Sequence, residues 1–298
     1  MSMFANFPTD SIENQHLRLE YLSQAGPRIV RLFLAGSEEN QLVEIPDISQ
    51  DTPYGAYLFL GGHRLWHAPE ALPRTYIPDD KGLEVEKFSD GIRLTGSTEE
   101  ATGIQKSIEI RLQADRPALA IHHAMRNNGL WPVDLAPWAI TQLPLGGLAI
   151  FPQTEGPLDA DGLLPNRQLV FWPYSQWNDP RLQLHDDYIL IRAEPKLPPI
   201  KIGYLNRRGW LGYLRGGVLF TKQFFTQLDR PHVDFGCNCE SYCNHLFIEL
   251  ETLGPLTRLE PGQMVSHTEI WAFYQAEGIP QTHHGISELV KSLALSSP

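Results

Sequence analysis

Residues 245–274 read HLFIELETLGPLTRLEPGQMVSHTEIWAFY, which contains two strand patterns joined by a longer connection. In residues 246–251, leucine and isoleucine alternate with Phe247, Glu249 and Glu251, and a period of two residues is typical of a strand with two different faces. Turn signals at Gly254-Pro255 and Pro261-Gly262 interrupt the pattern. A second alternating run then places four residues on one face of the next strand: His267, Glu269, Trp271 and Phe273.

Two carboxylates two residues apart on one strand point the same way, so Glu249 and Glu251 share one environment. On a solvated face this pair carries no function. On a face half-buried by Phe247 and by the aromatic residues of the next strand, one of the two carboxyl groups would have a raised pKa. The sequence leaves both interpretations open.

The 298 residues fit either two average domains or one large β domain. Glycine and proline, 24 of each, are spread along the chain rather than gathered in a linker. We find no internal repeat, low-complexity tract or charge run. We therefore expect one domain, residues 1–298.

The net charge of −11 argues against nucleic acid or an anionic membrane as the main partner. No apolar run approaches the roughly 18 residues of a membrane span. The first residues, MSMFANFPTDSIENQ, lack the basic start and apolar core of a signal peptide, so we expect a cytoplasmic protein.

Strand-like segments bounded by Asp, Gly or Pro recur through most of the chain, and this rhythm indicates a large all-β sandwich or barrel. They include HLRLEYL (16–22), RIVRLFLAG (28–36), LEVEKF (83–88), GIRLTGS (91–97), GIQKSIEIRLQ (103–113) and ALAIHHAMRNN (118–128). His122 and His123 are adjacent in one of them, so one should be buried and the other exposed. Apolar residues at helical spacing predict one helix near the C-terminus: Ile286, Leu289, Val290 and Leu293.

The segment GGHRLWHAPE (61–70) is a second candidate site. Gly61-Gly62 permit backbone conformations that other residues resist. The next residues combine an arginine that forms paired hydrogen bonds (Arg64), a flat apolar ring (Trp66) and a histidine that titrates near neutral pH (His63 or His67). Such a group fits a hydroxylated ligand, or else a structural network at the edge of a sheet.

Cys237, Cys239, Cys243 and His245 offer four metal-binding side chains within nine residues. Their spacing is not that of the usual zinc pairs, and an extended chain would hold the last two far from the first two. We expect no metal and favour buried reduced thiols, with a zinc site as the alternative. An odd cysteine number also argues against a disulfide framework.

Aromatic residues crowd the proline-punctuated loop at Phe171, Trp172, Tyr174 and Trp177. Either this loop folds onto the sandwich, or it forms a stacking platform for a ligand. Lys201 and Lys222 lie in strand-like segments and are candidates to point into a cavity, although nothing local decides their direction.

Leu250-Glu251-Thr252, Pro255 and the later Leu259-Glu260-Pro261-Gly262 resemble the C-terminal signature of the galactose mutarotase (aldose 1-epimerase) superfamily. The wider phrase ELETLGPL…LEPG…H-x-E-x-W is most similar to a poorly characterised bacterial branch of that superfamily. The resemblance implies a supersandwich of two large, mostly antiparallel sheets with few short helices. It also implies a small-molecule sugar or sugar derivative as ligand, and no cofactor.

The resemblance assigns Glu251 as the general base on the anomeric hydroxyl group. By position, Arg64 matches the sugar-contacting arginine and His67 a nearby histidine, and either His63 or His67 would serve as the acid. Further binding residues are expected from the two candidate segments and their surroundings: Trp66, Trp138, Thr141, Gln142, Trp172, Lys222 and Glu249.

Residues 136–142, APWAITQ, occupy the place where mutarotases carry their general-acid histidine, and no histidine is present there. Three functions therefore remain: an aldose 1-epimerase-like isomerase that uses another acid, a sugar-binding or sensing protein without catalysis, and a carbohydrate lyase or hydrolase relative. Fold does not decide among them.

Overall fold

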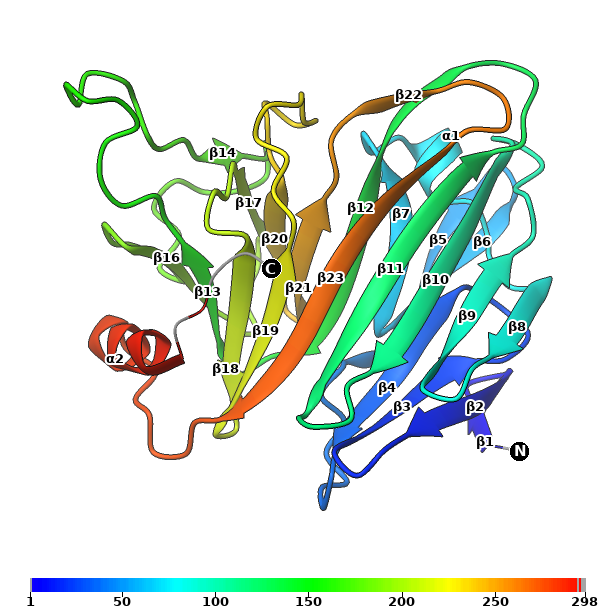
Figure 1. Ribbon diagram of the computed structural model, residues 1–298, viewed down its shortest axis with the longest axis horizontal. Helices are drawn as coiled ribbons and strands as arrows, with labels where there is room; N and C mark the ends of the chain where they lie inside the picture. The colour runs from blue at the N-terminus through cyan, green and yellow to red at the C-terminus, as the bar shows by residue number, and fades with distance from the viewer. Residues whose placement is uncertain (1, 294, 296–298) are drawn as a thin grey trace.

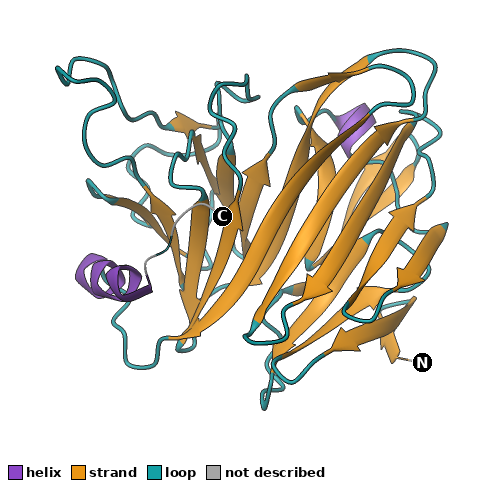
Figure 2. Cartoon of the chain, in the orientation of Figure 1, coloured by secondary structure: helices purple, strands orange, loops and turns teal. Residues whose placement is uncertain are grey.

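Two large antiparallel sheets pack face to face in the computed structural model, which describes residues 2–293 and 295 (Figure 1). Strands dominate the chain, and two helices occur in its described part (Figure 2). The all-β sandwich expected from the strand rhythm is confirmed. The expected C-terminal helix is also present, as α2 (His283–Leu293).

The first sheet has 11 strands within the described residues. Ten follow the order β1-β2-β3-β4-β7-β12-β21-β20-β17-β14, and the eleventh, β22, pairs with the first residues of β12, on the N-terminal side of the part that pairs with β21. Its strands are β1 (Ser2–Phe4), β2 (Phe7–Glu13), β3 (Leu17–Leu22), β4 (Arg28–Leu34), β7 (His63–Ala68), β12 (Val133–Pro144), β14 (Val170–Phe171), β17 (Ile200–Tyr204), β20 (Cys239–Cys243), β21 (Phe247–Leu253) and β22 (Thr257–Leu259).

The second sheet has 10 strands within the described residues, in the order β15-β16-β13-β18-β19-β23-β11-β10-β9-β8. Its strands are β8 (Leu83–Lys87), β9 (Gly91–Gly96), β10 (Ile104–Leu112), β11 (Ala118–Asn127), β13 (Leu148–Pro152), β15 (Leu182–Leu184), β16 (Tyr188–Arg192), β18 (Trp210–Arg215), β19 (Val218–Phe224) and β23 (Met264–Gln275). The two strands expected in residues 245–274 therefore belong to different sheets, because the connection between β21 and β23 crosses the sandwich.

The main core lies between the two sheets and is built from alternate residues of their strands. Leu250 of β21 and Trp271 of β23 are both fully buried in it. Helix α2 packs its apolar residues, including Ile286 and Val290, on the outer face of the second sheet. On β11, His123 is buried and His122 is exposed, as the alternation predicts.

A hairpin of β5 (Glu44–Thr52) and β6 (Gly55–Gly61) leads directly into β7. The tight junction between β6 and β7 requires glycine at position 62. Gly62 has φ +69°, and a Cβ atom there would lie 2.0 Å from the carbonyl oxygen of Ile29. Any side chain at this position would therefore displace the start of β7. A single-turn helix, α1 (Leu72–Thr75), follows β7.

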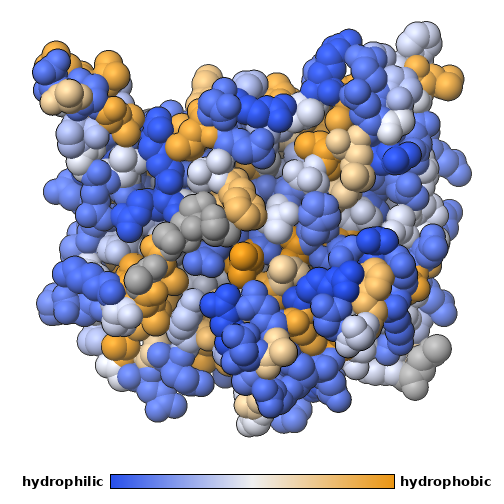
Figure 3. All heavy atoms as spheres, viewed as in Figure 1, coloured by the Kyte–Doolittle hydropathy of each residue, from blue (hydrophilic) through white to orange (hydrophobic). Residues whose placement is uncertain are grey.

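The face seen in Figure 3 is mainly hydrophilic, with apolar side chains in separate groups rather than one continuous patch. Neither described helix has the length and apolar character that crossing a membrane would require.

Candidate functional site

Side chains of the first sheet divide between the core and the face turned away from the second sheet. On the central strand β12, Trp138 pairs with Trp66 of β7, and Gln142 pairs with Glu249 of β21. The outer face collects the polar and aromatic residues of five neighbouring strands: Arg64, Trp66, Trp138, Gln142, Glu249, Glu251, Glu240 and Lys201. Glu249 and Glu251 thus share a face, and that face is buried rather than solvated.

A cavity of about 550 Å³ lies over this face, a volume suited to a small ligand. Strand β5 of the hairpin forms one wall, and Tyr174 and Pro199 form another. The polar and aromatic lining includes Arg64, Trp66, Glu70, Trp138, Lys201, Tyr242, Asn244 and Glu249.

Glu249 is held at the cavity by one of its two carboxylate oxygens. Oε1 accepts hydrogen bonds from Arg64 Nη2 at 3.1 Å and from Gln142 Nε2 at 2.8 Å. The side chain keeps 10% of its surface exposed. Because Oε1 is occupied, Oε2 is the oxygen available to a ligand.

Burial raises the pKa of Glu249 to about 7, and the nearby charge of Glu251 acts in the same direction. The cations Arg64 and Lys201 oppose this shift without cancelling it. A carboxyl group with this pKa exchanges protons readily near neutral pH, which is the property of a general acid or base.

Glu251 lies deeper and has no exposed surface. Its Oε2 accepts hydrogen bonds from Trp138 Nε1 at 2.7 Å and from Lys201 Nζ at 3.1 Å, while Oε1 is buried and has no partner among the described residues. Lys201 also forms an ion pair of 2.8 Å with Glu240. Burial alone would lower the pKa of Lys201, but Glu240 and Glu251 hold it well above its ordinary value. Lys201 is therefore a charged ammonium group at the cavity wall.

Aromatic rings surround the charged groups. The Arg64 guanidinium lies 4.3 Å from the centre of the Trp66 ring, and Lys201 Nζ lies 4.5 Å from that of Trp138. Trp66 and Trp138 meet edge to face at 5.4 Å, and Trp66 Nε1 donates to the hydroxyl oxygen of Tyr57. These contacts fix the rotamers of the cations and give the cavity a flat apolar wall.

Four residues expected at the ligand lie inside the sandwich instead: His63, His67 and Thr141 on the inner face of the first sheet, and Lys222 on β19 of the second sheet. His63 and His67 alternate with Arg64 along β7, so their rings point into the sandwich when Arg64 points out. The His67 ring lies 3.6 Å from Glu99, and its two ring nitrogens have no hydrogen-bond partner among the described residues. The geometry therefore gives neither histidine contact with the cavity, and Thr141 and Lys222 are core residues.

Among the described residues, one group is close enough to hold a metal ion: His63, His123 and Glu269, whose ligand atoms lie within 4.8 Å of one another. Its electrostatics do not favour a metal. The Lys222 ammonium group already contacts Glu269 at 2.9 Å, and a divalent cation would add two charges to a fully buried site.

The cysteine array does not converge. Cys239 and Cys243 are buried in the main core, whereas the Cys237 thiol lies on the other face, beside Gly203. His245 is exposed. All three cysteines are free and buried, and burial raises the pKa of each thiol.

Trp172 covers Lys201 on the site face, 4.7 Å from the ammonium to the ring centre, but does not line the cavity. Several lining residues were not assigned from the sequence. Tyr242 and Asn244 lie in the CESYCNH segment, on either side of Cys243. The wall formed by Ile48, Ser49 and Gln50 has no sequence signal, because only the hairpin fold brings it there.

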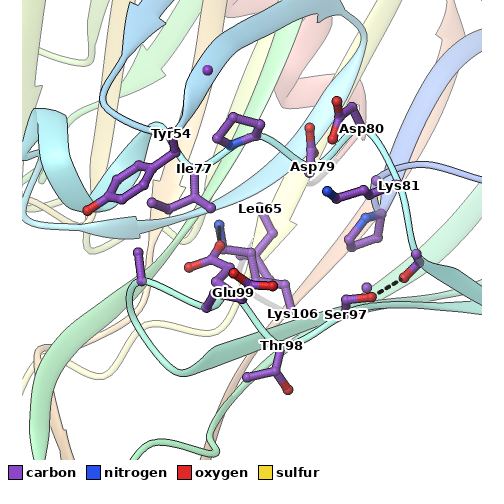
Figure 4. A pocket seen from close by; sticks show the side chains of 18 of the residues that line it. Tyr54, Leu65, Ile77, Asp79, Asp80, Lys81, Ser97, Thr98, Glu99 and Lys106 are labelled. Carbon is purple, nitrogen blue, oxygen red and sulfur yellow. Dashed lines mark hydrogen bonds and ion pairs between the residues drawn. The ribbon is translucent and has the colours of Figure 1, made fainter.

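A second cavity, of about 500 Å³, opens beside Leu65 of β7 (Figure 4). Two of its carboxylates are already paired with protein cations: Glu99 with Lys106 at 2.5 Å, and Asp79 with Arg28 at 2.7 Å. We therefore place the candidate site in the first cavity, where Glu249 keeps a free oxygen.

No family model matches the chain, and no curated protein matches its sequence. Solved structures match its fold. A galactose mutarotase-like protein from Lactobacillus casei is 11% identical over 90% of this chain and 100% of that one, with a TM-score of 0.61. A galactose mutarotase related enzyme from Lactobacillus acidophilus is 11% identical over 91% and 99%, with a TM-score of 0.53.

A TPR-domain containing protein from Parabacteroides distasonis is 13% identical over 92% of this chain, with a TM-score of 0.63. This chain spans about half of that protein, 49% of its length. At these identities the likeness concerns the fold, and the chain has the galactose mutarotase-like sandwich fold, as its motifs indicate.

Proposed function

We propose that the chain binds an aldose in the cavity over β7, β12 and β21 and interconverts its anomers. The observation that carries this proposal is the state of Glu249. Its pKa is about 7, one oxygen is held by Arg64 and Gln142, and the other is available to a ligand. The mutarotase-like fold supports a sugar as the ligand class.

In this proposal Glu249 takes the proton of the anomeric hydroxyl group as the bond between C1 and the ring oxygen breaks. The Lys201 ammonium group stabilises the negative charge that develops on the ring oxygen. Rotation about the C1–C2 bond and reversal of these steps close the ring on the other face of C1. Every proton is returned, so no cofactor or co-reactant is needed.

The family resemblance would give the base role to Glu251. Its side chain is fully buried behind Trp138 and Lys201, so in our proposal Glu251 orients Lys201 while Glu249 contacts the sugar. Arg64, Trp66 and Trp138 bind the sugar hydroxyl groups and its apolar face.

Sugar binding without catalysis is the second candidate, because no histidine lines the part of the cavity formed by described residues. NMR exchange spectroscopy on glucose and galactose separates the two functions. We expect the protein to accelerate anomer exchange above buffer and Glu249→Gln to abolish the acceleration while binding persists. Glu288→Gln, an exposed change on α2, is the control with unchanged activity. Binding with no acceleration by the unmodified protein would establish the second candidate.

A further inference from the structure

A chain of hydrogen bonds crosses the core between the two sheets, directly behind the candidate site. His123 Nδ1 lies 3.0 Å from the carbonyl oxygen of His267, so Nδ1 carries the proton and Nε2 is an acceptor. His63 Nε2, at 2.8 Å from His123 Nε2, must then donate to it. His63 Nδ1 in turn accepts from the hydroxyl group of Thr141 at 2.9 Å. All three groups are satisfied with both imidazoles neutral.

A buried ion pair completes this network. Lys222 Nζ contacts Glu269 Oε1 at 2.9 Å and donates to the carbonyl oxygens of Leu250 at 2.9 Å and Ala139 at 3.3 Å. Its three N–H groups thus have three acceptors. Glu269 also accepts from Trp271 Nε1 at 2.8 Å and from the hydroxyl group of Thr252.

The network contacts three strands of the site, β7, β12 and β21, each one residue away from a site side chain. His63 precedes Arg64 on β7, and Thr141 precedes Gln142 on β12. On β21, Thr252 follows Glu251, and Leu250, whose carbonyl Lys222 binds, separates Glu249 from Glu251. The same backbone therefore carries site residues on one face and network residues on the other.

We propose that this buried network fixes the relative positions of β7, β12 and β21, and that Lys222 and Glu269 are positioning residues for the Glu249 site. The expected effect of this network on activity rests on the proposed function. A buried ion pair is costly to desolvate, and apolar residues of similar volume often give equal or greater stability. A fully satisfied polar network instead specifies one defined geometry. In this protein that geometry is the relative position of the strands that carry Arg64, Gln142 and Glu249.

The double variant Lys222→Met/Glu269→Gln tests this role. It removes both charges and the bonds to Leu250 and Ala139, while the glutamine still accepts from Trp271. We expect an unchanged melting temperature within a few degrees, a KM within threefold and a kcat lowered at least tenfold. The matched control is Arg181→Met/Asp179→Asn, which removes another buried ion pair, of 2.7 Å, and should leave kcat unchanged, because the backbone acceptors of Arg181 are those of Lys196, Pro198 and Cys243 rather than residues of β7, β12 or β21.

A second measurement needs no sugar. In ligand-free protein, a ¹³C NMR titration follows the Glu249 carboxyl group, and we expect its midpoint to move from about 7 in the double variant but not in the control. If the unmodified protein catalyses no anomer exchange, the proposed function fails while this titration still tests the network. An unchanged midpoint together with unchanged kinetics would overturn the positioning role. Should the double variant not fold, Thr252→Val, which keeps the shape of the side chain, provides the same two readouts.

Discussion

Arg64 Nη2 lies 3.1 Å from Glu249 Oε1 although 185 positions separate them in the sequence, because their strands, β7 and β21, both pair with β12. The pair is almost fully buried, and the Arg64 nitrogens Nε and Nη1 have no partner among the described residues. This ion pair brings together, at one cavity, the two segments that the sequence analysis identified as candidate sites, GGHRLWHAPE and ELETLGPL.

Arg64→Ala should weaken sugar binding by roughly ten- to a hundredfold, because a buried charged hydrogen bond is lost and a carboxylate is left without its cation. Removing the cation also raises the pKa of Glu249 above about 7. Isothermal titration calorimetry measures the binding loss. Arg64→Lys, which keeps the charge without the planar fork, should recover only part of the affinity. Full affinity in Arg64→Ala would remove this residue from the site.

Glu249→Gln should stabilise the protein at pH 8. The folded-state pKa of Glu249, about 7, lies above its unfolded value, so the ionised form costs stability, and that cost grows as the pH rises from about 4.5 through 7. The neutral amide avoids it, by a difference on the order of 1–3 kcal/mol above pH 8. Urea unfolding at pH 8 and at pH 4.5 checks this, because the advantage of the variant should vanish at the lower pH. A variant less stable than the parent at pH 8 would contradict the raised pKa.

Gly62→Ala should destabilise the protein by more than about 2 kcal/mol, through both a left-handed backbone and a collision with the carbonyl oxygen of Ile29. Gly36→Ala is a matched control: its φ is +78°, but no atom lies within 4 Å of the added carbon. The control should lose only about 1 kcal/mol. Thermal unfolding of both variants isolates the collision. Equal losses of stability in the two variants would mean that the backbone around Gly62 can shift to accommodate the added carbon, and that Gly62 does not fix the position of β7.

A metal chelator should leave the melting temperature unchanged. Cys239 and Cys243 lie in the apolar core, Cys237 lies on the other face and His245 is exposed, so these four groups cannot share one ion. Differential scanning fluorimetry with and without the chelator is sufficient. A fall of several degrees, restored by zinc, would show that the protein holds a metal after all.

The sequence by itself determined the fold class and which neighbouring side chains of a strand share a face. Alternation with a period of two is a local property, so it showed correctly that Glu249 and Glu251 share a face and that His122 and His123 do not. The Gly61-Gly62 pair before β7 is likewise visible in the sequence, because backbone conformations with positive φ favour glycine.

Only the tertiary structure decided which face of β7 lines the cavity. Arg64 and His63 are neighbours in the chain, and nothing local tells which of them points into the core, because both faces of β7 are buried. The depth of the two glutamates is also a tertiary property: Trp138 and Lys201, from other strands, cover Glu251 and leave Glu249 at the cavity. The same packing decided the direction of Lys222, whose ammonium group contacts Glu269 and two strand carbonyl oxygens between the sheets.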